Sequence, residues 1–223
     1  MKGHSQKGFS LIEILVAMAL VSIILLIAVG TDFSDRKSLD QILDKYERVI
    51  RFSSDEAILK NNFVRMNLNI DKDDGQHLSL EYSDDKNFVI DLELARRENS
   101  ESESDKELRE EKEKEQNSSF SNVPEFEAED FELPGNVVLL GSGSELTENF
   151  ITSGKTQIYF YPNGQKDASI IIFATSDELA TLEIEPFRRV INRRYIKIPE
   201  DFNGEFEEYI VEKANEIFNE WAK

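Results

Sequence analysis

Lys7-Gly8-Phe9-Ser10-Leu11-Ile12-Glu13, with the apolar run that follows it to Val29, is the stretch on which the rest of the chain depends. From Phe9 to Val29 the only charged residue is Glu13, and the run contains neither Pro nor Gly. About twenty-one residues at about 1.5 Å each make a helix of roughly 30 Å, the thickness of the hydrocarbon core of a bilayer. The sequence therefore predicts a transmembrane helix over residues 9–30.

Glu13 is the unusual residue of this run, because a carboxylate within an apolar span is costly and marks a candidate functional site. It lies four residues after Phe9, which is about one helical turn. The leader, residues 1–8, carries Lys2 and Lys7 and no acid, whereas acids dominate after the span. The positive-inside rule places the N-terminus in the cytoplasm and the rest of the chain on the other side of the membrane.

This N-terminal arrangement resembles the class III signal of type IV prepilins and type II secretion pseudopilins, which have a short basic leader ending in Gly, then Phe, and Glu at the fifth mature position. The resemblance implies that a membrane-embedded prepilin peptidase and N-methyltransferase cleaves between Gly8 and Phe9 and methylates the new amino group of Phe9. It also implies that Glu13 pairs with the amine of a neighbouring subunit, in a filament built of other pilins or pseudopilins on an inner-membrane assembly platform. Opposite charges about 4 Å apart attract by roughly 4 kcal/mol at an effective dielectric constant near 20, before desolvation is subtracted.

Two other interpretations of the N-terminal stretch stay open. A secretory signal peptide also has a basic start and an apolar core, and Ala28-Val29-Gly30 loosely resembles a small-residue cleavage site. Its core, however, would contain Glu13 and would be longer than is usual. The other interpretation is a plain membrane anchor.

The composition of the chain limits the classes of function. The 223 residues include 26 Lys and Arg and 45 Asp and Glu, a net charge of −19. This acidity argues against a nucleic-acid partner, because phosphate binding needs an excess of basic residues on the contacting face. The chain has no cysteine and only two isolated histidines, His4 and His77. We find no catalytic constellation, metal site or cofactor motif, and expect that the protein is not an enzyme.

Beyond the span, residues 31–61 are predicted to form the amphipathic periplasmic part of the same helix. Apolar residues recur at three- and four-residue spacing from Leu39 to Ala57, with charged residues between them. Asn61-Asn62 marks the expected stop, just after Lys60.

After the helix the apolar period changes to two. Residues 64–70, 78–82 and 88–94 predict three strands of an antiparallel meander. The segment Asp71-Lys72-Asp73-Asp74-Gly75 departs from the EF-hand calcium loop, because Gly stands one position early and Tyr82 occupies the place of the bidentate Glu. We interpret it as a solvated hairpin turn. Further strands are expected at 137–140 and, as a second antiparallel set, at 158–161, 169–174 and 181–184, with a Gly/Ser loop over 141–154.

Residues 95–130 differ in kind from the rest. From Glu98 to Glu115 there are nine acids, four bases and one apolar residue, Leu108. Such sequence cannot bury enough apolar surface to order itself, so it is predicted to be a flexible acidic insertion. It divides a periplasmic β domain into residues 62–94 and 131–199.

The final segment, residues 200–223, is predicted to hold a short C-terminal helix. One face of that helix carries Phe206, Tyr209, Ile210, Lys213, Ile217 and Trp221. Just before it lies a basic patch made of Arg188, Arg189, Arg193, Arg194 and Lys197. The helix is expected either to fold back on this patch or to dock on a neighbouring pseudopilin.

Two internal stretches extend the resemblance. Tyr159-Phe160-Tyr161-Pro162-Asn163-Gly164, followed by an apolar strand and then by Leu182-Glu183-Ile184-Glu185-Pro186-Phe187, is similar to the C-terminal sheet of the H-type minor pseudopilins. Arg51 to Ile58, running into Val64-Arg65-Met66, is similar to the helix-to-strand junction of that group.

The resemblance implies an α+β fold in which a long N-terminal helix packs on antiparallel sheets. It implies a minor pseudopilin of the type II secretion system, which assembles into the periplasmic pseudopilus that drives protein export across the outer membrane. The close alternative is a type IV minor pilin that primes a surface fibre. The alternative from another class is a membrane-tethered periplasmic enzyme or binding protein.

Overall fold

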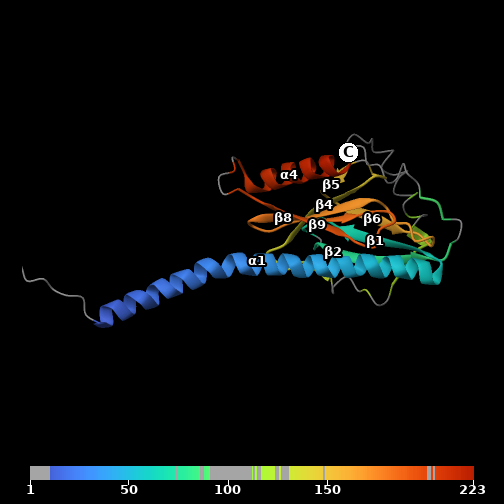
Figure 1. Ribbon diagram of the computed structural model, residues 1–223. Coiled ribbons are helices and arrows are strands. Elements are labelled where there is room, and N and C mark those ends of the chain that lie inside the picture. Colours follow the sequence, from blue (N-terminus) through green and yellow to red (C-terminus); the bar gives the residue numbers. More distant parts are fainter. Residues whose placement is uncertain are drawn as a thin grey trace, which may run out of the picture.

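The computed structural model describes residues 11–73, 75–85, 88–90, 112, 114, 117–123, 126, 131–147, 149–199, 202 and 204–223. The predicted leader and the Gly8–Phe9 cleavage site lie outside the described residues, as does most of the predicted insertion. A long helix, α1 (Leu11–Lys60), lies along one side of two antiparallel sheets, and a shorter helix, α4 (Phe206–Trp221), lies on the opposite side (Figure 1). The N-terminal part of α1 projects beyond the sheets (Figure 1). The expected α+β class with a short C-terminal helix is confirmed.

The end of α1 is where the sequence predicted it. Asn61 has a φ of 51°, in the left-handed region. The N–H of Asn62 donates to the carbonyl of Ala57 at 3.2 Å, which closes the helix in the manner of a Schellman motif. The apolar stripe is buried as expected and contains Leu39, Ile42, Leu43, Tyr46, Val49, Ile50 and Ala57.

Nine strands are described, and every pairing is antiparallel. The first sheet has the order β3 (Ser121–Asn122), β2 (His77–Ser83), β1 (Phe63–Asn69) and β6 (Lys155–Phe160). The second sheet has the order β5 (Phe150–Ile151), β4 (Val138–Ser144), β7 (Ser169–Ala174), β8 (Glu178–Ile184) and β9 (Asn192–Lys197).

The predicted meander is wrong in its third strand. Residues 88–90 are not in a strand, and 91–94 lie outside the described residues. The third strand was expected beside β2, where the structure has β3, and the other edge of β1 pairs with β6 from Val64↔Phe160 to Asn69↔Lys155. The expected second set is wrong in the same respect, since 158–161 contribute to the first sheet and only β7 and β8 to the second. Alternation indicates that a strand has one buried face, but it does not specify the neighbour that pairs with it.

Other corrections concern segments judged irregular from their composition. The predicted Gly/Ser loop over 141–154 contains the end of β4 and all of β5. Small residues are required there, because a Cβ at Gly141 would lie 2.3 Å from the carbonyl oxygen of Ile151. Strand β9 was not predicted. The insertion predicted over 95–130 also extends too far, since β3 pairs with β2 and Phe120 and Val123 are buried.

The second sheet is covered by helices on both faces. One face packs against α1 through Leu139, Ile171, Phe173, Ala180 and Leu182. The rings of Tyr46 and Phe173 meet edge to face with centroids 4.9 Å apart. The other face packs against α4 through Leu140, Ile170, Ile172, Ala174 and Leu179. The first sheet packs against α1 with the inward residues of β1, β2 and β6, among them Val64, Met66, Leu80 and Ile158.

The C-terminal helix packs on its own chain. Ile210, Ala214, Ile217 and Phe218 of α4 are buried against β4 and β7. The basic patch is not its partner. Arg189 and Arg193 form ion pairs with α1, and Arg188 and Arg194 form ion pairs with Glu185 and Glu183. The expectation that the C-terminal helix folds back on the basic patch is therefore wrong. Instead, an apolar face of α4 packs on an apolar face of the second sheet.

Candidate assembly helix

The N-terminal part of α1 exposes apolar side chains around the whole helix. Every side chain from Ile12 to Ile23 is exposed. The large ones include Ile12 at 70% and Met18 at 67%. Soluble monomers rarely expose a contiguous apolar surface of this kind, so this segment is a contact surface for lipid or for other helices.

Glu13 is the only charged side chain in this exposed segment. It lies in the first turn of α1, where a carboxylate also interacts favourably with the helix dipole. Its neighbours on the helix surface include Ala17, Met18 and Val21, which line a shallow groove with it. Such a carboxylate on an apolar helix face gains most from a cation brought by another molecule.

A charged stripe on the C-terminal part of α1 forms ion pairs with the second sheet. Residues of the stripe recur every three or four positions, which places them on one helix face: Arg36, Asp40, Asp44, Glu47, Arg51 and Asp55. This face runs beside β8 and β9 and the loop between them, because its ion pairs go to Glu178, Arg193 and Arg189.

Two clusters make most of these contacts. In the first, Arg36 Nη1 lies 2.7 Å from Glu178 Oε2, and its guanidinium lies 3.6 Å from the ring centroid of Tyr195. The Tyr195 hydroxyl donates to Asp40 at 2.8 Å. In the second, Arg193 pairs with both Asp44, at 2.7 Å, and Glu47.

The second cluster lowers the pKa of Glu47. Burial alone raises the pKa of Glu47, but hydrogen bonds from Arg193 and Arg51 outweigh it and hold that pKa below its ordinary value. Glu47 is therefore ionised in the folded protein at neutral pH. The two sheets and α4, which we call the head, thus form one unit with the C-terminal part of α1. The exposed apolar segment projects from this unit (Figure 1).

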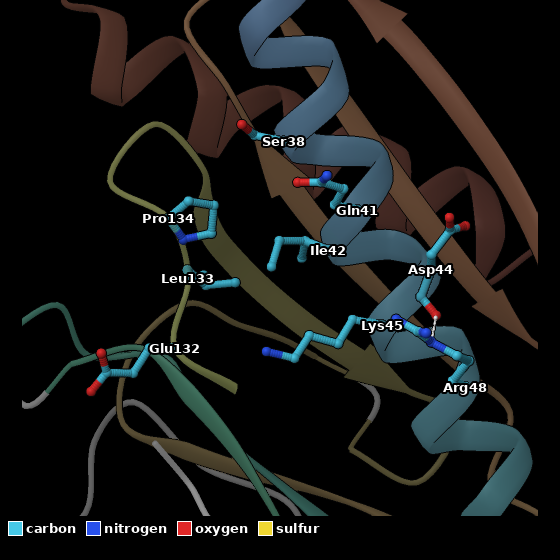
Figure 2. Close-up of a pocket in the computed structure, with 9 residues that line it drawn as sticks. All are labelled: Ser38, Gln41, Ile42, Asp44, Lys45, Arg48, Glu132, Leu133 and Pro134. Carbon is cyan, nitrogen blue, oxygen red and sulfur yellow. Dashed lines mark hydrogen bonds between the residues drawn. The ribbon is translucent and has the colours of Figure 1, made fainter. Parts of the chain in front are cut away.

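A groove borders α1 on the side of the segment that precedes β4. It has a volume of about 540 Å³ and is lined by six residues of α1 and by Glu132, Leu133 and Pro134 (Figure 2). Lys45 and Arg48 line it from the helix, and Arg48 Nε donates to the carbonyl of Asp44 at 3.2 Å. The lining has no histidine or cysteine, and no cluster of three or more metal-ligating side chains occurs among the described residues.

Comparison with known proteins identifies the N-terminal stretch. Residues 3–29 match the family described as the prokaryotic N-terminal methylation motif. The match includes Gly8, Phe9 and Glu13 and supports a type IV pilin-like or pseudopilin protein. The methylation motif implies processing by a prepilin peptidase, assembly with other pilins and a membrane-anchored N-terminus. No curated protein and no solved structure matches the chain.

The structure describes the predicted site residues unequally. Glu13 is placed on an exposed helix, whereas Gly8 and Phe9 lie outside the described residues. In the part of the chain that the structure does describe, no helix combines the length and the apolar character that crossing a membrane requires. The transmembrane helix over 9–30 therefore stays a prediction.

Sequence reasoning missed the ion pairs between α1 and the second sheet. It treated Arg193 as part of a basic patch for the C-terminal helix, but Arg193 pairs with acids of α1. A signal was present, because Asp40, Asp44 and Glu47 share one face of the predicted helix beside its apolar stripe. A helix face with that many acids predicts basic residues on the element that packs beside it.

Proposed function

We propose that the protein is a minor pseudopilin of the type II secretion system, of the H type, and that it has no enzymatic activity. Its N-terminal helix would anchor it in the bacterial inner membrane as a single span, with the N-terminus in the cytoplasm and the head in the periplasm. After cleavage at Gly8 and methylation of Phe9, the helix packs among those of other subunits in the pseudopilus.

The observation that carries this proposal is the methylation motif over residues 3–29, on a helix whose exposed residues 12–23 carry the single charge of Glu13. The fastening of α1 to the head supports it as well. Arg36 of α1 pairs with Glu178 of β8, and Asp44 of α1 pairs with Arg193 of β9, so the C-terminal part of α1 is held against the second sheet.

The same motif supports a type IV minor pilin that primes a surface fibre, and a deletion strain separates the two proposals. Loss of secreted enzymes from the medium with normal surface fibres supports the pseudopilin. Loss of fibres with normal secretion supports the minor pilin.

The processing step is tested by mass spectrometry of the N-terminal peptide from membranes. We expect a mature chain that begins with N-methylated Phe9. An intact Met1 contradicts both filament proposals and leaves a membrane tether.

The role of Glu13 is tested by Glu13→Ala in the full chain. The variant should stay in the membrane fraction but lose most of its cross-linking to other filament subunits, because the charge pair with a neighbouring amine is gone. Glu208→Ala, at an exposed position of α4, is the matched control and should cross-link like the wild type. Equal cross-linking of all three proteins argues against charge pairing.

A further inference from the structure

The C-terminal end of α1 lies at the end of the molecule opposite the projecting apolar segment (Figure 1). Two segments far away in the sequence meet it there. Arg189, in the loop between β8 and β9, forms an ion pair with Asp55 of α1. The backbone N–H of Lys166, which follows β6, donates to the carbonyl of Pro186 in the same loop at 3.1 Å. The helix, the segment after β6 and the loop thus form one surface.

A cavity of about 230 Å³ lies where these three segments meet. It is lined by four residues of α1, among them Arg51 and Asp55, by Lys166, and by two residues of the loop, among them Arg189. The lining therefore holds three cations and one carboxylate, in a chain whose net charge is −19. A concave site lined mainly by one sign of charge attracts a ligand of the other sign, so the cavity favours an anion.

Lys166 is the cation of this lining that has no carboxylate partner among the described residues. Both arginines of the lining pair with acids, whereas Lys166 Nζ donates to the backbone carbonyl of Arg188 at 2.6 Å. Lys166 is only 4% exposed, and lysine is rarely buried so deeply without a paired carboxylate. Burial and the nearby Arg189 lower the pKa of Lys166, and Glu185 offsets them only in part. Since an ammonium has three N–H donors, a carboxylate in the cavity would accept from those that remain.

Exposed apolar side chains flank the cavity lining. Ile58 and Leu59 lie one helical turn after the lining residues of α1, and Phe187 and Val190 belong to the loop between β8 and β9. Leu59 is 81% exposed and Phe187 is 75% exposed. Among the described side chains beyond residues 12–23, these are four of the six large apolar ones that are exposed. Together with the cavity we call them the distal patch. Exposed apolar residues gathered in one place indicate a contact surface.

We propose that the distal patch docks another protein, which places the carboxylate of a Glu or Asp side chain beside Lys166 and packs apolar side chains on the exposed apolar residues around it. A free anion would gain nothing from those apolar residues, and a wholly apolar partner would leave Lys166 unmatched. The proposal does not depend on the pseudopilin proposal, because the test below measures binding by the isolated chain and not its assembly.

A lipid surface fits the distal patch less well than a protein does. Thirty-two residues of α1 separate Asp55 from Ile23 in the exposed apolar segment, which is about 48 Å of helix. A membrane that holds this segment is therefore far from the patch. The net charge of −19 also opposes the approach of anionic headgroups.

The test uses the full chain in phosphatidylcholine nanodiscs and two blocked five-residue peptides. One peptide has a central Glu between Leu and Phe, and the other has Gln in its place. Glutarate is the free anion, and empty nanodiscs report any peptide that binds lipid. Binding is measured by saturation-transfer difference NMR. We expect the Glu peptide to bind with a Kd of about 0.1–1 mM, and the Gln peptide and glutarate about tenfold more weakly.

Three variants locate the binding. Lys166→Met removes the ammonium but keeps most of the stem, and it should abolish the preference for the Glu peptide. Arg189→Gln, at an exposed position, should lower that preference about threefold, and it serves if circular dichroism shows that Lys166→Met is not folded. Val190→Ser should weaken both peptides. Lys213→Met, on α4, is the matched control and should bind like the wild type.

Four results overturn the proposal. Absence of peptide binding up to about 5 mM leaves a cavity occupied by water. Equal binding of the two peptides shows that no carboxylate is recognised. Binding of glutarate as tight as that of the Glu peptide indicates a site for a free anion. A preference for the Glu peptide that Lys166→Met and Arg189→Gln leave unchanged places the site elsewhere.

A lipid partner gives a different result. If phosphatidylserine nanodiscs abolish binding of the Glu peptide that phosphatidylcholine nanodiscs allow, a lipid headgroup occupies the patch, and the docking of a protein is contradicted. Equal binding in both kinds of nanodisc supports the protein partner.

Discussion

The two sheets of the head differ in what covers their outer faces. In the second sheet, every residue of β7 is buried, because α1 covers one face and α4 the other. In the first sheet, α1 covers the inner face, and the outer face carries polar residues of β1, β2 and β6, among them Asn67, Ser79 and Gln157. Apolar packing is thus concentrated around the second sheet, whereas the outer face of the first sheet is mainly polar.

The largest effect is expected from removing an outer-face residue of the second sheet. Ile172 is fully buried under α4, so Ile172→Ala should lower the free energy of unfolding by about 2–5 kcal/mol. Ser79→Ala, on the outer face of the first sheet, should change it by no more than about 0.5 kcal/mol. Urea unfolding of the full chain, followed by the fluorescence of Trp221, measures both. Equal losses would show that the two outer faces contribute alike to stability.

A smaller effect is expected where α4 approaches the second sheet most closely. A Cβ at Gly143 would lie 2.4 Å from Cε2 of Phe218, so Gly143→Ala should displace α4 and cost about 1–3 kcal/mol. Gly135→Ala is the matched control, because a Cβ there meets nothing within 4 Å. The same unfolding measurement applies.

A double-mutant cycle sharpens this prediction. In a chain that already carries Phe218→Ala, the further cost of Gly143→Ala should largely disappear, since the clashing ring is gone. An unchanged cost would mean that Gly143 is needed for its backbone and not for the approach of α4.

The smallest effect concerns the link between the sheets at Asp167. This carboxylate follows β6 and precedes β7, and it accepts from the Tyr159 N–H at 2.9 Å and from the Tyr161 hydroxyl at 2.8 Å. Burial raises the pKa of Asp167 from 3.8 to about 6, although both hydrogen bonds oppose the rise. Between these two values the folded protein holds a proton that the unfolded chain has lost. The free energy of unfolding therefore falls as the pH rises through this window.

Asp167→Asn is neutral at every pH and should remove that decline. Relative to the wild type, the variant should gain about 1–3 kcal/mol between pH 4 and pH 6, measured by urea unfolding at a series of pH values. Asp84→Asn, at an exposed position, should follow the wild-type curve. Parallel curves for the wild type and Asp167→Asn would show that another group controls the pH dependence.

Local sequence patterns were enough to predict those helices and strands whose structure depends mainly on their own residues. The apolar stripe from Leu39 to Ala57 predicted the helix, Asn61 marked its end, and the spacing of Phe206 to Trp221 predicted α4. Alternation placed β1 and β2 to within one or two residues. In each case the signal is the period of apolar residues, which records that one face of the element is buried.

Pairing between distant segments was not predictable in this way. Nothing local to residues 155–160 shows that they join β1 instead of β7, because both neighbours bury the same kind of face. Arg193 belongs to a basic patch in the sequence but to the acids of α1 in the fold. The polar outer face of the first sheet was not predicted either, since its residues come from three strands that only the sheet register brings together.

The sequence by itself determined the N-terminal motif and the long amphipathic helix, because these depend on neighbouring residues and on their period. Only the tertiary structure decided which sheet each strand joins, which face α4 covers and which polar atoms are buried without partners. Those outcomes depend on contacts between residues far apart in the chain. The free energies of these contacts cannot be inferred from any one segment alone.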